Sequence, residues 1–208
     1  KETREEFLAK TGLPDRPMIA LLAGSRNGEI GSMMPTFMTF ADKLHALPEY
    51  SDYRFVVAAA PARSESDYAK YIGGREYVSV VFGQSYAVMR HARAAVVNSG
   101  TASLECALIG TPQVVAYKGA EINFLIAKMI IKIQYISLGN LILDRICFRE
   151  LLQYYFTPDN VLYEVRRMIE DEEYRSAMLA GYQEIRDALG GEGASAAVAG
   201  AMIEELKQ

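Results

Sequence analysis

Tryptophan is absent from this chain of 208 residues, and cysteine and histidine each occur only twice. The two cysteines, Cys106 and Cys147, have neither the spacing of a zinc site nor the number that a disulfide framework needs. A reducing compartment is therefore the expected environment. With only His45 and His91, a histidine-rich metal site is disfavoured, and the sequence predicts no bound metal.

An excess of positive charge and a long apolar run are also missing. The formal net charge is −4, which disfavours a nucleic-acid-binding surface, although a single loop with one or two cations could still hold an anion. No run reaches the roughly 18 uncharged apolar residues that a membrane-spanning helix requires. The segment 1–17 lacks an initiator Met and the apolar core of a signal peptide, so we expect an excised half of a larger protein.

Several catalytic motifs are absent as well. No G-x-S-x-G sequence marks a hydrolase nucleophile, and no Asp-x-Asp pair offers the metal-diphosphate clamp of one large class of sugar transferases. The glycines at 24, 28 and 31 do not fit G-x-G-x-x-G, and no Gly-Lys-Ser/Thr sequence forms a P-loop. A nicotinamide oxidoreductase is therefore disfavoured, and no cofactor is expected.

Apolar stretches rich in β-branched or small residues alternate with helical patterns along most of the chain. The strand candidates are MIALLAG (18–24), YRFVVAAA (53–60), EYVSVVFG (76–83), RAAVVNSG (93–100) and TPQVVAYK (111–118). This alternation predicts a doubly wound, mostly parallel α/β sheet of the Rossmann type. After about residue 148 only helical patterns remain. We expect a helix or linker from a missing domain over 1–17, a Rossmann-like domain over 18–150 and a helical tail over 151–208.

The loop Gly24-Ser25-Arg26-Asn27-Gly28 follows the first predicted strand and suits an anion. Ligands of open parallel sheets bind where strands end and loops enter helices. Gly24 permits close backbone approach, Ser25 offers a hydroxyl, and the next helix presents unpaired N–H groups. Arg26 adds a permanent charge whose fork matches phosphate oxygens. A tight turn with a surface arginine is the alternative, and spacing alone does not decide between the two.

A second loop, Ser99-Gly100-Thr101, also leads from a strand into a helix. Ser99 or Thr101 could simply cap that helix, which by itself is the simpler account. Glu105 shares a helix face with Thr101, where its carboxylate would suit ribose hydroxyls or merely favour the helix dipole. Two such loops on nearby strands suggest one nucleotide held between them.

Three weaker signals follow. Gly83 and Gln84 form a third strand-to-helix turn, for which helix capping is the usual explanation. Tyr117 ends the fifth predicted strand, where its ring could meet a base. The segment 123–133 sets two lysines among bulky apolar residues, which is typical of a core helix with a solvated face and less often of a helix at a membrane surface.

The stretches LLAGSRNGEI, VVNSGTASLECALIGTPQVVAYK and YISLGNLILDR together resemble lipid-A-disaccharide synthases, specifically the C-terminal half of that family. The resemblance runs from about Ile19 to the end of the chain. Two departures are Ala23 and Gly139, at each of which the family usually has proline. Asn140 matches the Asn of the family motif, and the resemblance makes it a candidate substrate-binding residue.

The resemblance implies an inverting glycosyltransferase of the GT-B type, in which this half binds the UDP-sugar and a missing N-terminal domain binds the acylated sugar phosphate acceptor. Arg26 would stabilise the leaving diphosphate with Ser25 and the Ser99-Gly100-Thr101 turn, Glu105 would bind ribose, and Tyr117 would lie near uracil. The enzyme would act peripherally at the cytoplasmic face of the bacterial inner membrane, because both substrates are acylated. This half alone should bind UDP without catalysing.

Other assignments stay open at this point. A UDP-GlcNAc 2-epimerase, the peptidoglycan GlcNAc transferase or a non-catalytic nucleotide-sugar-binding module would keep the same fold. The small-residue helix near the end of the chain, ASAAVAGAMIEEL, would expose an apolar face without a partner domain. We expect it to self-associate, swap or pack locally, so that a homodimer is one expected form.

Overall fold

The computed structural model of the chain describes residues 2–119 and 135–190. In chain order the elements are α1 (Arg4–Thr11), β1 (Met18–Leu22), α2 (Asn27–His45), η1 (Pro48–Tyr50), β2 (Arg54–Ala59), α3 (Glu65–Ile72), β3 (Val78–Phe82), α4 (Ser85–His91), β4 (Ala94–Asn98), α5 (Thr101–Ile109), β5 (Gln113–Tyr117), α7 (Leu138–Leu143), β6 (Glu150–Leu152), η2 (Gln153–Tyr155), α8 (Pro158–Glu170) and α9 (Glu172–Ala188). The predicted segment 123–133 and the predicted final helix lie outside the described residues.

The strands form one sheet in the order β3-β2-β1-β4-β5-β6, with every neighbouring pair parallel. All five residues of β1 and of β4 are buried, as expected when helices cover both faces of a parallel sheet. The predicted doubly wound α/β fold and its five strands are therefore confirmed. Because the order reverses between β1 and β4, the fold has a topological switch point there.

The expectation that strands stop near residue 148 was wrong, because β6 extends the sheet by three residues. Glu150, Leu151 and Leu152 pair in parallel with the end of β5. A strand this short has no measurable apolar period, and only Leu151 is buried. β6 also spans the boundary expected at residue 150, so the predicted sheet and tail share one core here.

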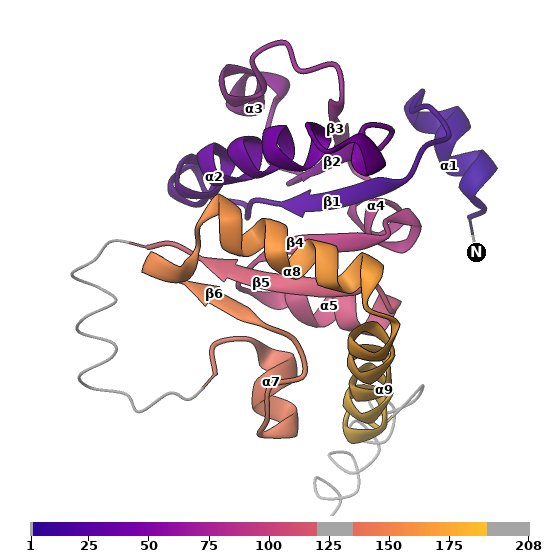
Figure 1. Cartoon of the computed structure of the whole chain (residues 1–208), viewed down its shortest axis with the longest axis vertical. Coiled ribbons are helices and arrows are strands. Elements are labelled where there is room, and N and C mark those ends of the chain that lie inside the picture. Colours follow the sequence, from indigo (N-terminus) through magenta and orange to yellow (C-terminus); the bar gives the residue numbers. More distant parts are fainter. Residues whose placement is uncertain (1, 120–134, 191–208) are drawn as a thin grey trace, which may run out of the picture.

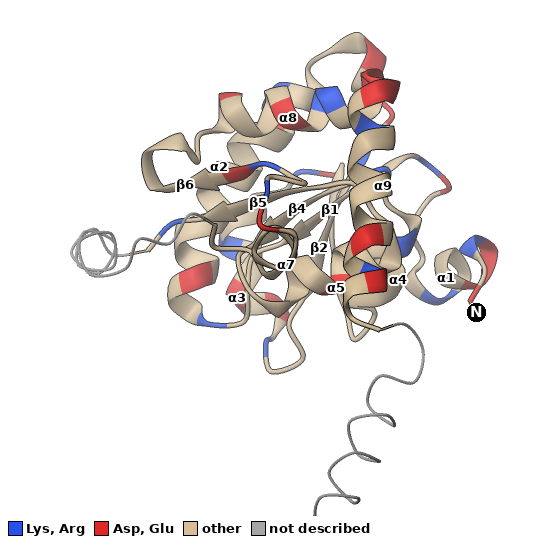
Figure 2. Ribbon diagram, turned by 90° about the horizontal axis from the view of Figure 1, so that it is seen from below, with Lys and Arg blue, Asp and Glu red and all other residues tan. Residues whose placement is uncertain are grey.

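Two hydrophobic clusters lie on opposite faces of the sheet. Ile19 and Leu21 of β1 point into the cluster with α2, α8 and α9, whereas Met18 and Ala20 point into the cluster with α1 and α4. Figure 2 shows the sheet between a layer with α2 and α8 and a layer with α4 and α5, with acidic and basic residues interspersed over the helices. The period-two pattern of β1 thus fixes which helix covers which face.

The long helix α2 covers its face with a stripe of apolar side chains. Its buried residues include Ile30, Met33, Phe37, Phe40 and Leu44. These positions are three or four apart, which places them on one side of a helix. Burying each side chain of this size stabilises the fold by about 1.5–3 kcal/mol relative to leaving it exposed to water.

The N-terminal helix α1 packs against the end of α4 (Figure 1). Phe7 is fully buried, and its ring stacks on His91 with 5.1 Å between centroids. Thr3 and Glu6 close the start of the helix with a capping box, and Gly12 ends it with φ +68°. In this structure α1 is thus part of the packed unit.

The helical tail expected after the sheet is present in α8 and α9. Helix α8 lies across β4 and β5 beside α2, and α9 follows it (Figure 1). Their core-facing residues, spaced four and three apart, are Val161, Val165 and Met168 in α8 and Met178, Tyr182 and Ile185 in α9. Among the described residues, no helix is both long and apolar enough to cross a bilayer.

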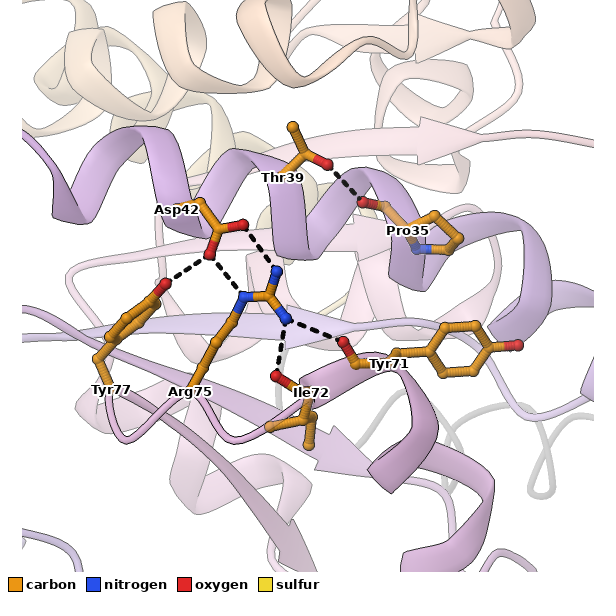
Figure 3. A network of polar contacts seen from close by, with 7 residues as sticks. All are labelled: Pro35, Thr39, Asp42, Tyr71, Ile72, Arg75 and Tyr77. Carbon is orange, nitrogen blue, oxygen red and sulfur yellow. Dashed lines mark hydrogen bonds and ion pairs between the residues drawn. The ribbon is translucent and has the colours of Figure 1, made fainter.

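A polar network ties α2 to the turn between α3 and β3 (Figure 3). The Asp42 carboxylate accepts hydrogen bonds from Arg75 Nε at 2.5 Å, from Arg75 Nη2 at 2.7 Å and from the Tyr77 hydroxyl. Arg75 Nη1 also donates to the backbone oxygens of Tyr71 and Ile72. The Arg75 guanidinium lowers the pKa of Asp42 below its usual value.

Asp42→Asn should lower the free energy of unfolding by about 1 kcal/mol at pH 7, because it weakens a half-exposed charged pair. A folded-state pKa below the unfolded one means that the carboxylate stabilises the protein above about pH 4. This contribution disappears as the pH falls through the folded-state pKa. Urea denaturation at pH 7 and pH 3 should therefore show a smaller difference from wild type at pH 3 than at pH 7.

Asp52→Asn is the matched control, because the Asp52 side chain is 71% exposed and contacts Arg16 only at 3.4 Å. It should leave the unfolding free energy unchanged within about 0.5 kcal/mol. Equal stability of wild type and Asp42→Asn at pH 7 would contradict the importance of the network.

Candidate functional site

The turns that follow β1 and β4 meet at the switch point of the sheet. Gly24 has φ +91°, and a Cβ added there would lie 2.6 Å from Asn98 Nδ2 at the end of β4. A larger residue at this position would displace the side chains of Glu29 and Asn98. The structure therefore brings together the two loops in which the sequence predicts an anion site, at the crevice where open α/β sheets bind ligands.

The turn after β1 is shorter than the sequence suggests, because α2 already begins at Asn27 and includes Gly28. The Glu29 carboxylate accepts the backbone N–H groups of Ser25 at 2.8 Å and Arg26 at 3.0 Å. A Cβ at Gly24 would lie 2.4 Å from Glu29 Oε2. Two backbone donors of the predicted anion loop are thus bonded to a side chain of the protein itself.

The role of Glu29 was not predicted, although its position in the sequence indicates it. It stands at the third position of α2, where an acidic side chain reaches back to the start of its helix in a capping box.

Two arginines flank this turn. The Arg26 side chain is 85% exposed, and its Nη1 lies 3.4 Å from Glu29 Oε1. Arg63, in the loop between β2 and α3, donates from Nε to the Ser25 oxygen at 2.7 Å and from Nη1 to Asn27 Oδ1 at 2.5 Å. Arg63 was not predicted from the sequence, because it lies 38 positions from Ser25 and belongs to no local motif. Arg26 extends into solvent, while Arg63 fixes the turn.

The turn after β4 starts α5 without a side-chain cap. Gly100 occupies the N-cap position and makes no side-chain hydrogen bond to the helix. Ser99 Oγ donates to the Ile136 oxygen at 3.5 Å, and Thr101 is exposed at the first helical position. Neither residue caps α5 in this structure, so the simpler account of this loop is wrong. The positive end of the α5 dipole remains available to an anion.

Glu105 lies on α5 where this helix packs beside α4. It is half-buried, and its carboxylate raises the pKa of the exposed Tyr86 phenol on α4.

Gly83 and Gln84 precede α4, and Gln84 is its N-cap without a side-chain hydrogen bond. They follow β3, and β2 and β1 lie between that strand and β4. Gly83 and Gln84 thus share an edge of the sheet with the two turns but do not adjoin the β4 turn.

Asn140 does not face a ligand site. It is fully buried, and its Nδ2 donates to the Phe148 oxygen and to Glu150 Oε1, both at 2.9 Å. Its Oδ1 accepts the backbone N–H groups of Cys147 and Phe148. This accounts for the whole hydrogen-bonding capacity of the amide. We therefore remove Asn140 from the substrate-binding candidates and assign it to folding of the α7 region.

Packing explains why residue 139 is glycine where the resembled family usually has proline. A Cβ at this position would lie 2.8 Å from Phe148 Cζ and 3.0 Å from Ile185 Cδ1. The bulky neighbours fill the space that a proline ring would need.

Other polar and reactive groups do not build a second centre among the described residues. No three or more His, Cys, Asp or Glu side chains are placed there to hold a metal ion. Burial raises the pKa of both cysteine thiols, to about 11 for Cys147. A cavity of about 230 Å³ lies at the opposite, amino-terminal edge of the sheet. Its lining residues are Arg16, His45, Ser51, Asp52, Arg54, Glu76 and Tyr77.

Solved structures share this fold at low sequence identity. MnaA of S. aureus, in a co-structure with UDP, matches with a TM-score of 0.64 and 14% identity over 100% of this chain and 50% of its own. A UDP-N-acetylglucosamine 2-epimerase of Listeria monocytogenes, itself named putative, matches with a TM-score of 0.61 and 16% identity over 99% and 49%. At these identities the likeness shows the fold alone.

Sequence comparison gives the family. A lipid-A-disaccharide synthase of Trichlorobacter lovleyi is 32% identical over 99% of this chain and 54% of its own length. That of Anaeromyxobacter dehalogenans is 34% identical over 95% and 52%. The chain thus spans about half the length of the curated relatives it matches. The profile of the family described as lipid-A-disaccharide synthetase matches residues 1–199. The chain therefore belongs to the lipid-A-disaccharide synthetase family.

Proposed function

We propose that this chain is the UDP-sugar-binding part of a lipid-A-disaccharide synthase. In the complete reaction, UDP-2,3-diacylglucosamine transfers its sugar to 2,3-diacylglucosamine 1-phosphate, forming a β-1,6 bond and releasing UDP. The observation that carries the proposal is the meeting of two turns at Gly24, one with the exposed Arg26 and the other with the uncapped start of α5. Family membership supports the choice of donor.

The diphosphate is assigned to the start of α5 rather than to the start of α2. At α2, Glu29 already accepts the N–H groups of Ser25 and Arg26 and would repel a second anion. At α5 no side chain of residues 2–119 and 135–190 occupies the equivalent place. The Arg26 guanidinium, exposed on the adjoining turn, supplies the countercharge.

This arrangement suits departure of UDP. Negative charge builds on the diphosphate as the bond to the sugar breaks, and Arg26 and the α5 dipole oppose that charge. Preorganised donors of this kind contribute roughly 3 kcal/mol each to the transition state. We assign acceptor binding, and the group that deprotonates the acceptor hydroxyl, to the part of the relatives' length that this chain does not span.

The remaining contacts follow from the order of the strands. Glu105, on the helix that starts at the diphosphate, is proposed to bind ribose, and Tyr117, at the end of the neighbouring β5, to lie beside uracil. Gly83 and Gln84 are proposed only as outer contacts of the donor, since two strands separate β3 from β4. Because both substrates are acylated, we place the enzyme peripherally at the cytoplasmic face of the inner membrane.

Calorimetric titration with UDP should show binding that weakens at least tenfold in Arg26→Ala, since a lost charged hydrogen bond costs about 1.5–3 kcal/mol. NAD should not bind. Arg90→Ala is the matched control, because Arg90 is exposed at the far end of α4, and it should leave the UDP affinity unchanged. A folded chain that binds no UDP, or equal UDP affinity in Arg26→Ala and wild type, would refute the assignment.

Glu105→Gln should weaken UDP binding roughly tenfold, since an uncharged amide accepts hydroxyl donors less strongly than a carboxylate. The same substitution should change the affinity for 2′-deoxy-UDP much less, because that ligand lacks one of the two ribose hydroxyls. Parallel titrations of both nucleotides with both proteins measure the difference. An equal loss for the two nucleotides would rule out a ribose contact.

A further inference from the structure

Gln153 has φ +50°, in the left-handed region that residues other than glycine and asparagine rarely adopt. It directly follows β6, whose last residue, Leu152, pairs with Tyr117 of β5. A backbone conformation of this kind costs free energy and persists where surrounding contacts require it.

The contacts of the Gln153 side chain explain why the conformation is kept. Its Nε2 donates to the Gly119 oxygen at 3.2 Å, and its Oε1 accepts the Gly119 N–H at 3.2 Å. The side chain therefore continues the β5–β6 ladder by one step after the main-chain pairing ends. It fixes the backbone of Gly119 through both of its polar groups.

Gly119 in turn supports the ring of Tyr117. A Cβ added at Gly119 would lie 2.4 Å from the Tyr117 hydroxyl oxygen and 2.9 Å from Cζ. The ring therefore lies directly over the Gly119 backbone, in space that only glycine leaves free. Gln153, Gly119 and Tyr117 form one continuous contact from η2 to the end of β5.

The other end of β6 reaches the second nucleotide-binding turn. Glu150 accepts the backbone N–H groups of Ile136 and Ser137, both at 3.0 Å. The Ile136 oxygen accepts the hydroxyl of Ser99. The short strand β6, which the sequence did not predict, thus pairs directly with Tyr117 at one end and contacts Ser99 through Ile136 at the other.

We propose that Gln153 is a positioning residue for nucleobase selection, because through Gly119 it sets the place of the Tyr117 ring. Glu150, at the other end of β6, holds Ile136, which accepts the hydrogen bond of Ser99. This proposal rests on the proposed function, because it takes the ligand to be a uridine nucleotide. It adds that discrimination between bases depends on a residue that does not itself touch the base.

The test measures the ratio of the dissociation constants of ADP and UDP, a readout that loss of stability alone does not move. Gln153→Gly removes the side chain and relieves the left-handed backbone. Gln153→Asn tolerates that backbone but is one methylene too short to reach both groups of Gly119. Both variants should keep a thermal midpoint within about 3 °C of wild type and lower the ADP-to-UDP ratio at least fivefold.

Two further variants separate the possible outcomes. Arg26→Ala should weaken both nucleotides equally and leave the ratio unchanged, because the diphosphate is common to them. Gly119→Ala displaces the Tyr117 ring without altering Gln153 and should lower the ratio. Wild type that prefers UDP, with the ratio preserved in the Gln153 and Gly119 variants, would overturn the positioning role and leave the proposed function intact. Wild type without preference for UDP would overturn both.

Discussion

The close packing of the Glu29 and Asn98 side chains on the Gly24 backbone is the constraint on which the rest of the candidate site depends. A Cβ there would lie within 2.6 Å of both Glu29 Oε2 and Asn98 Nδ2. This contact is possible because parallel pairing of β1 and β4 ends both strands at the same edge, where the strand order reverses. One loop then supplies an exposed arginine and the other a helix start.

The two turns differ in whether their backbone N–H groups are already bonded. Glu29 accepts the backbone N–H groups of Ser25 and Arg26, just before α2, and Arg63 donates to the Ser25 carbonyl and the Asn27 amide oxygen of the same turn. That turn therefore presents the exposed Arg26 guanidinium on a backbone whose N–H groups at Ser25 and Arg26 are already bonded. The start of α5, which no described side chain caps, retains the preference of a helix N-terminus for negative charge. Motif spacing alone suggests that the first loop holds the anion, whereas the proposed site places the anion at the start of α5 and leaves Arg26 as its countercharge.

The fold was predictable because its determinants are local. Buried strands such as Met18–Leu22 and the apolar stripe of α2 repeat at the periods that sequence patterns report. The site was predictable only in outline. The left-handed backbone of Gln153 and its hydrogen bonds to Gly119, 34 positions away, belong to no short sequence motif. Asn140 is the opposite case. A family motif drew attention to this residue, but the motif does not reveal that its side chain is buried and makes all of its hydrogen bonds within the protein.

The most direct test of the central claim is the response of individual backbone amides to UDP in a two-dimensional NMR titration of the 208-residue chain. If the diphosphate binds at α5, the amide signals of Thr101 and Ala102 should shift strongly. Those of Ser25 and Arg26 should move little, because their N–H groups stay on Glu29. Large shifts at Ser25 and Arg26 with none at Thr101 and Ala102 would contradict this account.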